Sequence, residues 1–264
     1  MLGVVIPAHN EAALIGQCLN SIKVAASNPR LGGERVLIVV VADGCSDLTE
    51  AIAVSCGALV LSTFKRNVGS ARDLGARLAI AHEARWLAFT DADTTVPEDW
   101  LVKQLECATD AVCGVITVSD WAGHPTETRA DFLATYRDME GHRHVHGANF
   151  GLSAAAYEAT GGFQPLAFNE DVALAQALTE NGFAIAWTNT VRVDTSARME
   201  SRTPLGFGAT LRMVSEKLKA KPAGPLSTRP RHACSSHGDV INDAQGDEQT
   251  LGAPQAAAIP LEGI

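Results

Sequence analysis

Two aspartates stand one residue apart directly after an apolar run in the stretch WLAFTDADTTVPEDW, residues 86–100. Side chains at alternate positions of an extended segment point the same way, so the carboxylates of Asp91 and Asp93 should share one side. Two such charges about 4 Å apart repel each other by about 4 kcal/mol near a protein surface. A divalent cation reverses that repulsion, which makes the pair a candidate metal site. The segment could instead cap the helix that Pro97 predicts.

Acidic residues also follow two other apolar runs and open one helical pattern. The turn PAHNE (7–11) follows the first run. Asp43 ends the second run, where it could accept a hydrogen bond from a ligand or simply form a turn. Glu170 and Asp171 begin the pattern EDVALAQALTENG, where negative charge suits the helix dipole. The first turn lacks the Gly-x-Gly-x-x-Gly pattern of a dinucleotide fold.

The elements that must position these residues alternate along the first part of the chain. Apolar runs predict strands at 2–7, 35–44, 58–62 and 86–90, and each is followed by a helical pattern. This order predicts an α/β fold, a Rossmann-like three-layer α/β/α sandwich with a mostly parallel central sheet. Ligands bind beyond the carboxyl ends of such strands, so the acidic turns should converge on one rim.

The second part of the chain is more mixed. Its patterns predict strands or extended segments at 111–120, 144–153, 183–187 and 190–196, and helices at 126–141, 153–162 and 170–182. We expect one domain over 1–219, with a nucleotide-binding half (1–95) and an acceptor and catalytic half (96–219). Residues 220–264 show no period and predict a flexible tail.

Composition excludes several classes of protein. The 264 residues include 46% hydrophobic residues, enough for a large core, and their net charge of −9 argues against a nucleic-acid binder with a broad basic surface. No apolar run reaches the length of about 18 residues that a membrane span needs, and the N-terminus lacks a secretory signal pattern. The six cysteines are scattered, so we expect a reduced, cytoplasmic protein.

Six segments occur in the order seen in family 2 glycosyltransferases of the GT-A fold, and the chain resembles that family over about residues 2–195. The segments are VVIPAHNEAALIGQCLNSI, VVVADGCSD, NVGSARDLGARLA, FTDADTTVPEDWL, GANFGLSAAAYEATGGF and NEDVALAQAL. The resemblance implies an inverting transferase that uses a nucleotide-diphosphate sugar, with Mg²⁺ or Mn²⁺ as the cofactor. The acceptor stays open: a small molecule, a lipid head group or a glycan.

The resemblance also implies roles for individual residues. The residues expected to flank the nucleoside or nucleotide are Pro7, Ala8, His9, Glu11, Asp43 and Arg72. Among them, Asp43 would accept a hydrogen bond from a uracil base. Asp91 and Asp93 match the metal-binding pair, with Asp93 the more direct ligand. The residues expected to line the sugar pocket are Gly147, Ala148 and Asn149. Asp171 matches the general base, and Glu170 would orient a neighbour or the acceptor.

The chain departs from the family pattern in two places. Ala42 replaces the first of two adjacent acids at the end of the second strand, and the stretch VDTSARMESRTPLGFGATLR (193–212), which comes after the helix at 170–182, has no histidine to serve as a third metal ligand. Arg198 and Arg202 are candidates for binding diphosphate oxygens. The alternating residues His142, His144 and His146 could form a zinc site, although a polar pocket wall is the simpler interpretation.

Two other functions stay open at this stage. A nucleotidyltransferase that makes the nucleotide sugar favours a Gly-rich, basic loop after the first strand, which PAHNEAAL is not. A catalytically silent nucleotide-sugar-binding protein would be expected to lose one of the acidic pairs, and both are present.

Overall fold

The computed structural model describes residues 1–121, 123–198, 211–213 and 215–216. The strands are β1 (Leu2–Ala8), β2 (Val36–Asp43), β3 (Leu59–Thr63), β4 (Trp86–Phe89), β5 (Thr94–Thr95), β6 (Ala111–Thr117), β7 (Phe150–Ser153) and β8 (Ile185–Thr195). The helices are α1 (Ile15–Ala26), α2 (Thr49–Ser55), α3 (Val68–Ala81), α4 (Trp100–Glu106), α5 (Thr126–Thr135), α6 (Ala154–Ala159), α7 (Glu170–Glu180) and the 3₁₀ helix η1 (Pro29–Leu31). Among these helices, none is long and apolar enough to cross a bilayer.

The eight strands form one sheet in the order β3-β2-β1-β4-β7-β6-β8-β5. β3, β2, β1 and β4 run parallel to one another, and β6 runs parallel to β8. β7 is antiparallel to both of its neighbours, and β5 is antiparallel to β8. The prediction of a mostly parallel α/β sheet is therefore confirmed.

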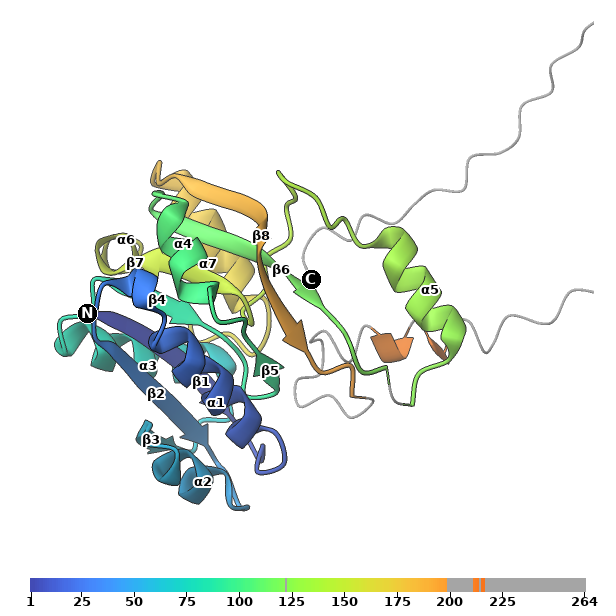
Figure 1. The fold of residues 1–264 in the computed structure, drawn as a ribbon, viewed down its shortest axis with the longest axis horizontal. Coiled ribbons are helices and arrows are strands. Elements are labelled where there is room, and N and C mark those ends of the chain that lie inside the picture. The colour runs from blue at the N-terminus through green and yellow to red at the C-terminus, as the bar shows by residue number, and fades with distance from the viewer. Residues whose placement is uncertain (122, 199–210, 214, 217–264) are drawn as a thin grey trace, which may run out of the picture.

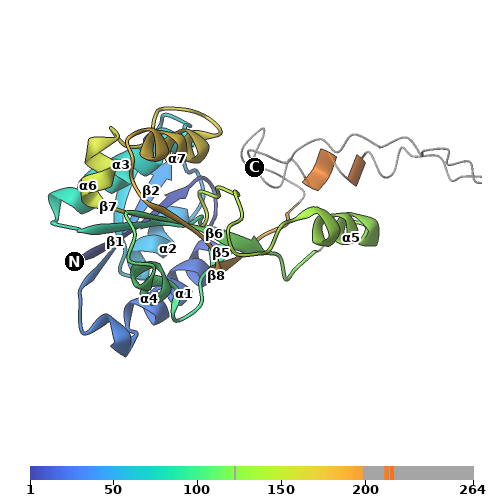
Figure 2. The ribbon, with the colours of Figure 1, turned by 90° about the horizontal axis from the view of Figure 1, so that it is seen from above.

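Helices cover both faces of the sheet (Figures 1 and 2). α1 and α4 lie on one face, and α3, α6 and α7 lie on the other. The pleat of β1 explains why both faces need cover: Leu2, Val4 and Ile6 pack on the α1 side, and Val5 packs on the α3 side. Side chains at alternate positions of β1 therefore pack into two hydrophobic clusters, one on each face of the sheet.

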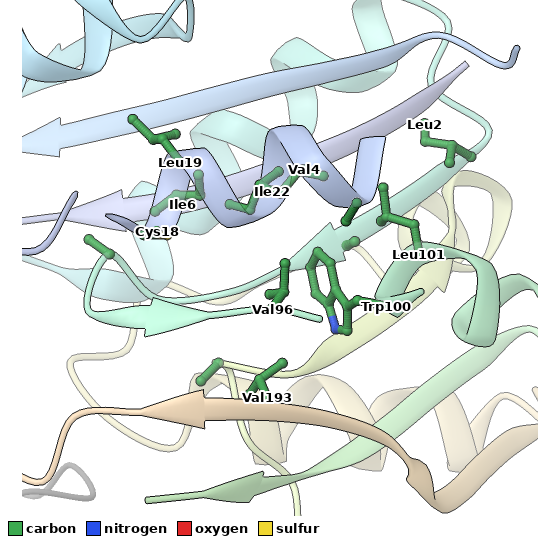
Figure 3. Close-up of a cluster of buried hydrophobic side chains, with 14 of the residues drawn as sticks. Leu2, Val4, Ile6, Cys18, Leu19, Ile22, Val96, Trp100, Leu101 and Val193 are labelled. Atoms are coloured by element: carbon green, nitrogen blue, oxygen red, sulfur yellow. The ribbon is translucent and has the colours of Figure 1, made fainter. Parts of the chain in front are cut away.

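Trp100 anchors the core on the α1 side (Figure 3). Its indole ring is fully buried in the same cluster as Leu2, Leu101 and Val193. Burying an apolar side chain of this kind stabilises the fold by about 1.5–3 kcal/mol. The cluster fixes β8 against α4, and this determines where the C-terminal end of β8 emerges.

Several predicted boundaries differ from the structure. The helix expected over 126–141 ends at Thr135, because Tyr136 adopts an extended conformation and its side chain packs toward β6. The two strands expected at 183–187 and 190–196 form the single strand β8. Residues 94–95, for which capping of the Pro97 helix was the alternative to a metal-site turn, form the short strand β5. Figure 2 shows α5 standing away from the sheet. The predicted tail, 220–264, lies outside the described residues.

Candidate active site

The turns after β1 and β2 are joined by hydrogen bonds. His9 Nδ1 lies 2.7 Å from the carbonyl oxygen of Asp43, and the Glu11 N–H donates to Thr49 Oγ1 at 2.8 Å. A carbonyl oxygen only accepts, so His9 Nδ1 carries the proton and a neutral His9 keeps Nε2 as an acceptor. Pro7 and His9 are partly exposed, and Ala8 is buried. The acidic turns therefore meet at one rim, at the carboxyl ends of the parallel strands.

Asp43 organises the loop that leads into α3. Its Oδ1 accepts the Arg66 N–H at 2.8 Å and its Oδ2 accepts the Asn67 N–H at 2.7 Å. Arg66 has a φ of 48°, a left-handed conformation that these bonds help to hold. Each carboxylate oxygen retains a second lone pair, so Asp43 can still accept from a ligand. Its role in nucleobase recognition stays a prediction.

Arg72 of α3 is a buried cation between two carboxylates. Its side chain is 4% exposed, and Nη2 donates to Asp91 Oδ1 at 2.6 Å while Nη1 donates to Glu170 Oε1. Gly147 covers the guanidinium so closely that a Cβ at that position would collide with it. The ring centroid of Phe163 lies 5.8 Å from the guanidinium carbon. Arg72 is therefore enclosed on several sides.

Asp93 and Glu11 share a second arginine, Arg198, which follows β8. The Arg198 guanidinium donates to both oxygens of Glu11 at 2.6 Å and lies 3.2 Å from Asp93 Oδ2. Burial, with the Asp91 carboxylate as the next cause, raises the pKa of Asp93 from 3.8 to about 7. Burial disfavours the charged carboxylate and the neighbouring Asp91 carboxylate adds to that effect, and a bound cation would oppose both.

Asp171 and Glu170 open α7 and point to different partners. Glu170 pairs with Arg72, whereas Asp171 Oδ2 accepts the Gly147 N–H at 2.6 Å and Oδ1 accepts the Val172 N–H at 2.8 Å. Adjacent residues of a helix are about 100° apart, which explains the divergence. Burial raises the pKa of Asp171, and the Arg72 guanidinium opposes that rise. A carboxylate with a raised pKa is suited to accept a proton near neutral pH.

The motif Gly147-Ala148-Asn149 is buried, and the Asn149 side chain is committed to the protein interior. Asn149 Nδ2 donates to the carbonyl oxygens of Val115 and Val191 at 2.8 and 2.9 Å, and its Oδ1 accepts the Trp100 Nε1–H at 2.9 Å. These bonds satisfy the backbone where the β6–β8 register shifts. The Asn149 side chain thus positions the motif, and its predicted place in a sugar pocket stays untested.

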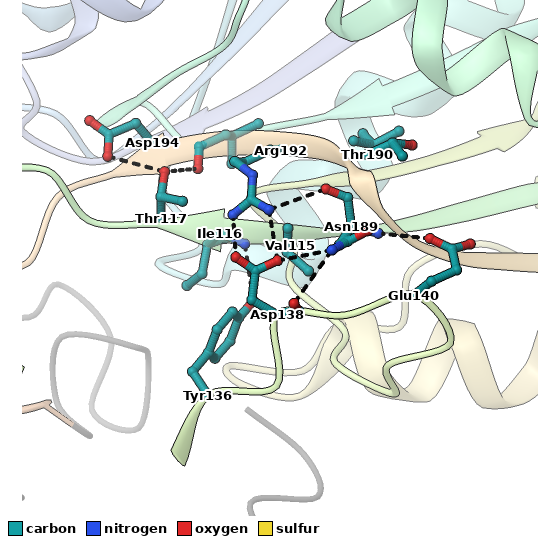
Figure 4. A network of polar contacts seen from close by, with 12 residues as sticks. Val115, Ile116, Thr117, Tyr136, Asp138, Glu140, Asn189, Thr190, Arg192 and Asp194 are labelled. Carbon is teal, nitrogen blue, oxygen red and sulfur yellow. Dashed lines mark hydrogen bonds and ion pairs between the residues drawn. The ribbon is translucent and has the colours of Figure 1, made fainter. Parts of the chain in front are cut away.

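Polar contacts join the segment after α5 to β6 and β8 (Figure 4). Arg192 makes a bidentate pair with Asp138, with N–O distances of 2.6 and 2.7 Å. The Tyr136 hydroxyl accepts the Ile116 N–H at 3.0 Å and lies 2.9 Å from His146 Nε2. Sequence reasoning missed Tyr136, although it is one of only two tyrosines and precedes the alternating histidines.

The three alternating histidines form a stack with Tyr136 and are not arranged around a common point. The ring centroids of Tyr136 and His144 are 4.4 Å apart, and His144 lies 5.4 Å from His142 and 5.7 Å from His146. Burial lowers the pKa of His146 to about 3, so that ring stays neutral. Within the described part of the chain, no group of three or more His, Cys, Asp or Glu residues could hold a metal ion. The zinc interpretation of the histidines therefore receives no support.

The charges of the rim do not balance among the residues that the structure describes. Five carboxylates surround two guanidinium groups, which leaves a formal charge of −3; the residues are Glu11, Asp91, Asp93, Glu170, Asp171, Arg72 and Arg198. Mg²⁺ is commonly held by one or two carboxylates together with substrate phosphates. Asp91 and Asp93 supply that kind of donor set, so the residues fit a divalent cation.

The sequence matches the family model described as glycosyl transferase family 2 over residues 3–161, more than half of the chain. The chain belongs to glycosyl transferase family 2. The matched range includes Asp43, Arg72, Asp91, Asp93 and Gly147. It ends before α7 and Arg198, so the functional assignment of those residues depends on geometry.

Solved structures share the GT-A fold with this family 2 chain. Residues 1–349 of S. aureus TarS, in complex with UDP-GlcNAc, give a TM-score of 0.62 at 17% identity, covering 78% of this chain and 61% of that one. The mannosyltransferase PcManGT from Pyrobaculum calidifontis, with GDP-Man and Mn²⁺, gives 0.57 at 21% identity, covering 84% and 64%. Glucosyl-3-phosphoglycerate synthase from Mycobacterium tuberculosis, with Mn²⁺, UDP-Glc and phosphoglyceric acid, gives 0.53 at 21% identity, covering 75% and 72%. The chain thus spans about three fifths of that TarS fragment and 36% of the longer chain in another TarS structure. No curated protein matches the sequence.

Proposed function

We propose that this chain transfers a sugar from a nucleotide-diphosphate sugar to an acceptor hydroxyl, with inversion at the anomeric carbon and with the help of a divalent cation. The observation that carries the proposal is the carboxylate cluster at the rim of the sheet, in a chain of glycosyl transferase family 2. The three neighbouring structures contain UDP-GlcNAc, GDP-Man and UDP-Glc, and two of them contain Mn²⁺. These ligands support a nucleotide-sugar donor, and a UDP-sugar is the donor that we expect.

The reaction makes one bond and breaks one. The acceptor oxygen bonds to the anomeric carbon, the bond from that carbon to the diphosphate oxygen breaks, and the nucleoside diphosphate leaves. Asp171 takes the proton of the acceptor hydroxyl, and the Gly147 N–H holds its carboxylate in position. When bound by Asp93 and Asp91, a divalent cation would supply stabilisation of the negative charge on the departing diphosphate.

The remaining residues bind and orient. We expect the nucleoside to bind beside His9 and Asp43, and Asp43 holds the loop by accepting hydrogen bonds from the N–H groups of residues 66 and 67. Arg72 fixes the direction of Asp91 and Glu170, so Glu170 acts through Arg72 and not on the acceptor. The acceptor is a hydroxyl compound whose class we leave to experiment.

A product assay with a panel of donors tests this function. The chain is incubated with UDP-, GDP- and ADP-sugars, with a set of acceptors, and with Mn²⁺ or EDTA; released nucleoside diphosphate and glycosylated product are measured together. We expect turnover with UDP-sugars that EDTA and Asp93→Asn nearly abolish. Glu106→Gln is the control, because Glu106 pairs with Arg30 at an exposed position of α4. Formation of a nucleotide sugar from UTP and a sugar phosphate would refute the proposal, and so would donor binding without any transfer.

A further inference from the structure

Arg198 bridges two carboxylates that lie far away in the sequence. It contacts Glu11 across 187 positions and is also paired with Asp93. The side chains of Glu11 and Asp93 are 7% and 13% exposed, whereas Arg198 is 26% exposed. Arg198 is therefore the most exposed of these three side chains.

The two arginines of the cluster differ in their freedom to move. Arg72 is 4% exposed, lies beneath Gly147 and pairs with Glu170 from inside the protein. Arg198 follows the end of β8, and its guanidinium makes its described contacts only to the two carboxylates, Glu11 and Asp93. Arg198 can therefore leave its partners without disturbing the core, and Arg72 cannot.

A cation that binds Asp93 has to accommodate the guanidinium beside it. The Arg198 guanidinium lies 3.2 Å from Asp93 Oδ2, so a cation on that carboxylate would be only a few ångströms from it. Two positive charges that close repel each other strongly at a protein surface. We propose that Arg198 is the resident counter-ion of Glu11 and Asp93, and that it competes with the divalent cation until a nucleoside diphosphate binds. The diphosphate brings negative charge that offsets both cations, so the metal binds weakly alone and firmly with the nucleotide. This inference rests on the proposed function, and it makes Arg198 a positioning residue of the metal site.

Manganese binding to the full chain without nucleotide provides the test. Free Mn²⁺ is titrated by electron paramagnetic resonance with the unchanged protein and with Arg198→Gln. The variant is expected to bind Mn²⁺ about tenfold more tightly, which corresponds to about 1.4 kcal/mol. Arg198→Lys keeps the charge and should bind like the unchanged protein. Addition of UDP should reduce the difference between Arg198→Gln and the unchanged protein.

Arg192→Gln is the matched control. Arg192 lies on β8, close in sequence to Arg198, and it too makes a bidentate pair with a carboxylate, that of Asp138, but it is not part of the cluster. The Arg192→Gln substitution removes the same charge as Arg198→Gln and should leave the Mn²⁺ affinity unchanged. An equal gain in Mn²⁺ affinity in Arg192→Gln and Arg198→Gln would overturn the inference. An unchanged or weaker Mn²⁺ affinity in Arg198→Gln would overturn it too. Failure of the proposed function has a different signature: Asp93→Asn would then bind Mn²⁺ and UDP as the unchanged protein does.

Discussion

Replacing Arg72 by methionine is expected to lower the free energy of unfolding by about 3–5 kcal/mol. The Arg72 guanidinium is 4% exposed, and its partners Glu170 and Asp91 are 5% and 37% exposed. Methionine fills much of the same volume, but it leaves the Glu170 carboxylate buried without a cation, and that is the main cost. A chain of about this length loses about 2–4 °C of melting temperature per kcal/mol, so Tm should fall by about 6–20 °C.

Arg85→Met is the matched control for that prediction. Arg85 also forms a bidentate pair, with Glu34, but it is 57% exposed. Exposed pairs contribute about 0–1 kcal/mol, so this variant should lose at most about 4 °C. The double variant Arg72→Met with Glu170→Gln should recover part of the loss, because the buried charge is gone. Differential scanning calorimetry at pH 7 compares the proteins. Equal losses for the two single variants, or no recovery in the double variant, would refute the reasoning.

Asp171→Asn should lower kcat by about 10²–10⁴-fold with little change in donor affinity, and the opposite ranking of Asp171→Asn and Glu170→Gln in steady-state kinetics would reverse the assignment. Because burial raises the pKa of Asp171, kcat should fall with falling pH through a pKa above 3.8, and a pH–rate profile without that fall contradicts the base role. Asp43→Asn should weaken UDP binding about tenfold, because the amide nitrogen of the new side chain would face a backbone N–H. Calorimetry tests the underlying claim: equal affinity of the unchanged protein for UDP and for ADP would count against nucleobase recognition by Asp43. Gly147→Ala should cost about 1–3 kcal/mol, because its Cβ has no room beside the Arg72 guanidinium, and an unchanged Tm would contradict the packing described.

Local patterns were sufficient to predict the strands and α-helices between residues 1 and 90. The continuous Val/Ile run of β2 has buried residues on both faces because helices cover both faces, and this follows from the composition of the run. The pattern failed where tertiary contacts override it. Tyr136 ends α5 because its hydroxyl binds Ile116 and its ring stacks on His144. β5 exists only because β8 pairs with it, and a two-residue strand has no period to detect.

The candidate site, like the fold, could be predicted from the sequence only in part. The rim position of Asp91 and Asp93 could be predicted, because both follow an apolar strand. Their partners could not, since Arg72 and Glu170 are 98 positions apart and Arg198 and Glu11 are 187 apart. Nothing in a local pattern distinguishes Arg198, which pairs with Asp93 in the cluster, from an exposed surface arginine.

The central claim is that Asp93 and Asp91 hold a divalent cation against the diphosphate of a nucleotide. Crystals grown with UDP and Mn²⁺, measured at a wavelength where manganese scatters anomalously, test this directly. We predict one strong anomalous peak within coordinating distance of the Asp93 carboxylate and of the UDP diphosphate, with the Arg198 guanidinium moved away from its position 3.2 Å from Asp93 Oδ2. Bound UDP with no anomalous peak at Asp93, or with the peak elsewhere in the protein, would contradict it.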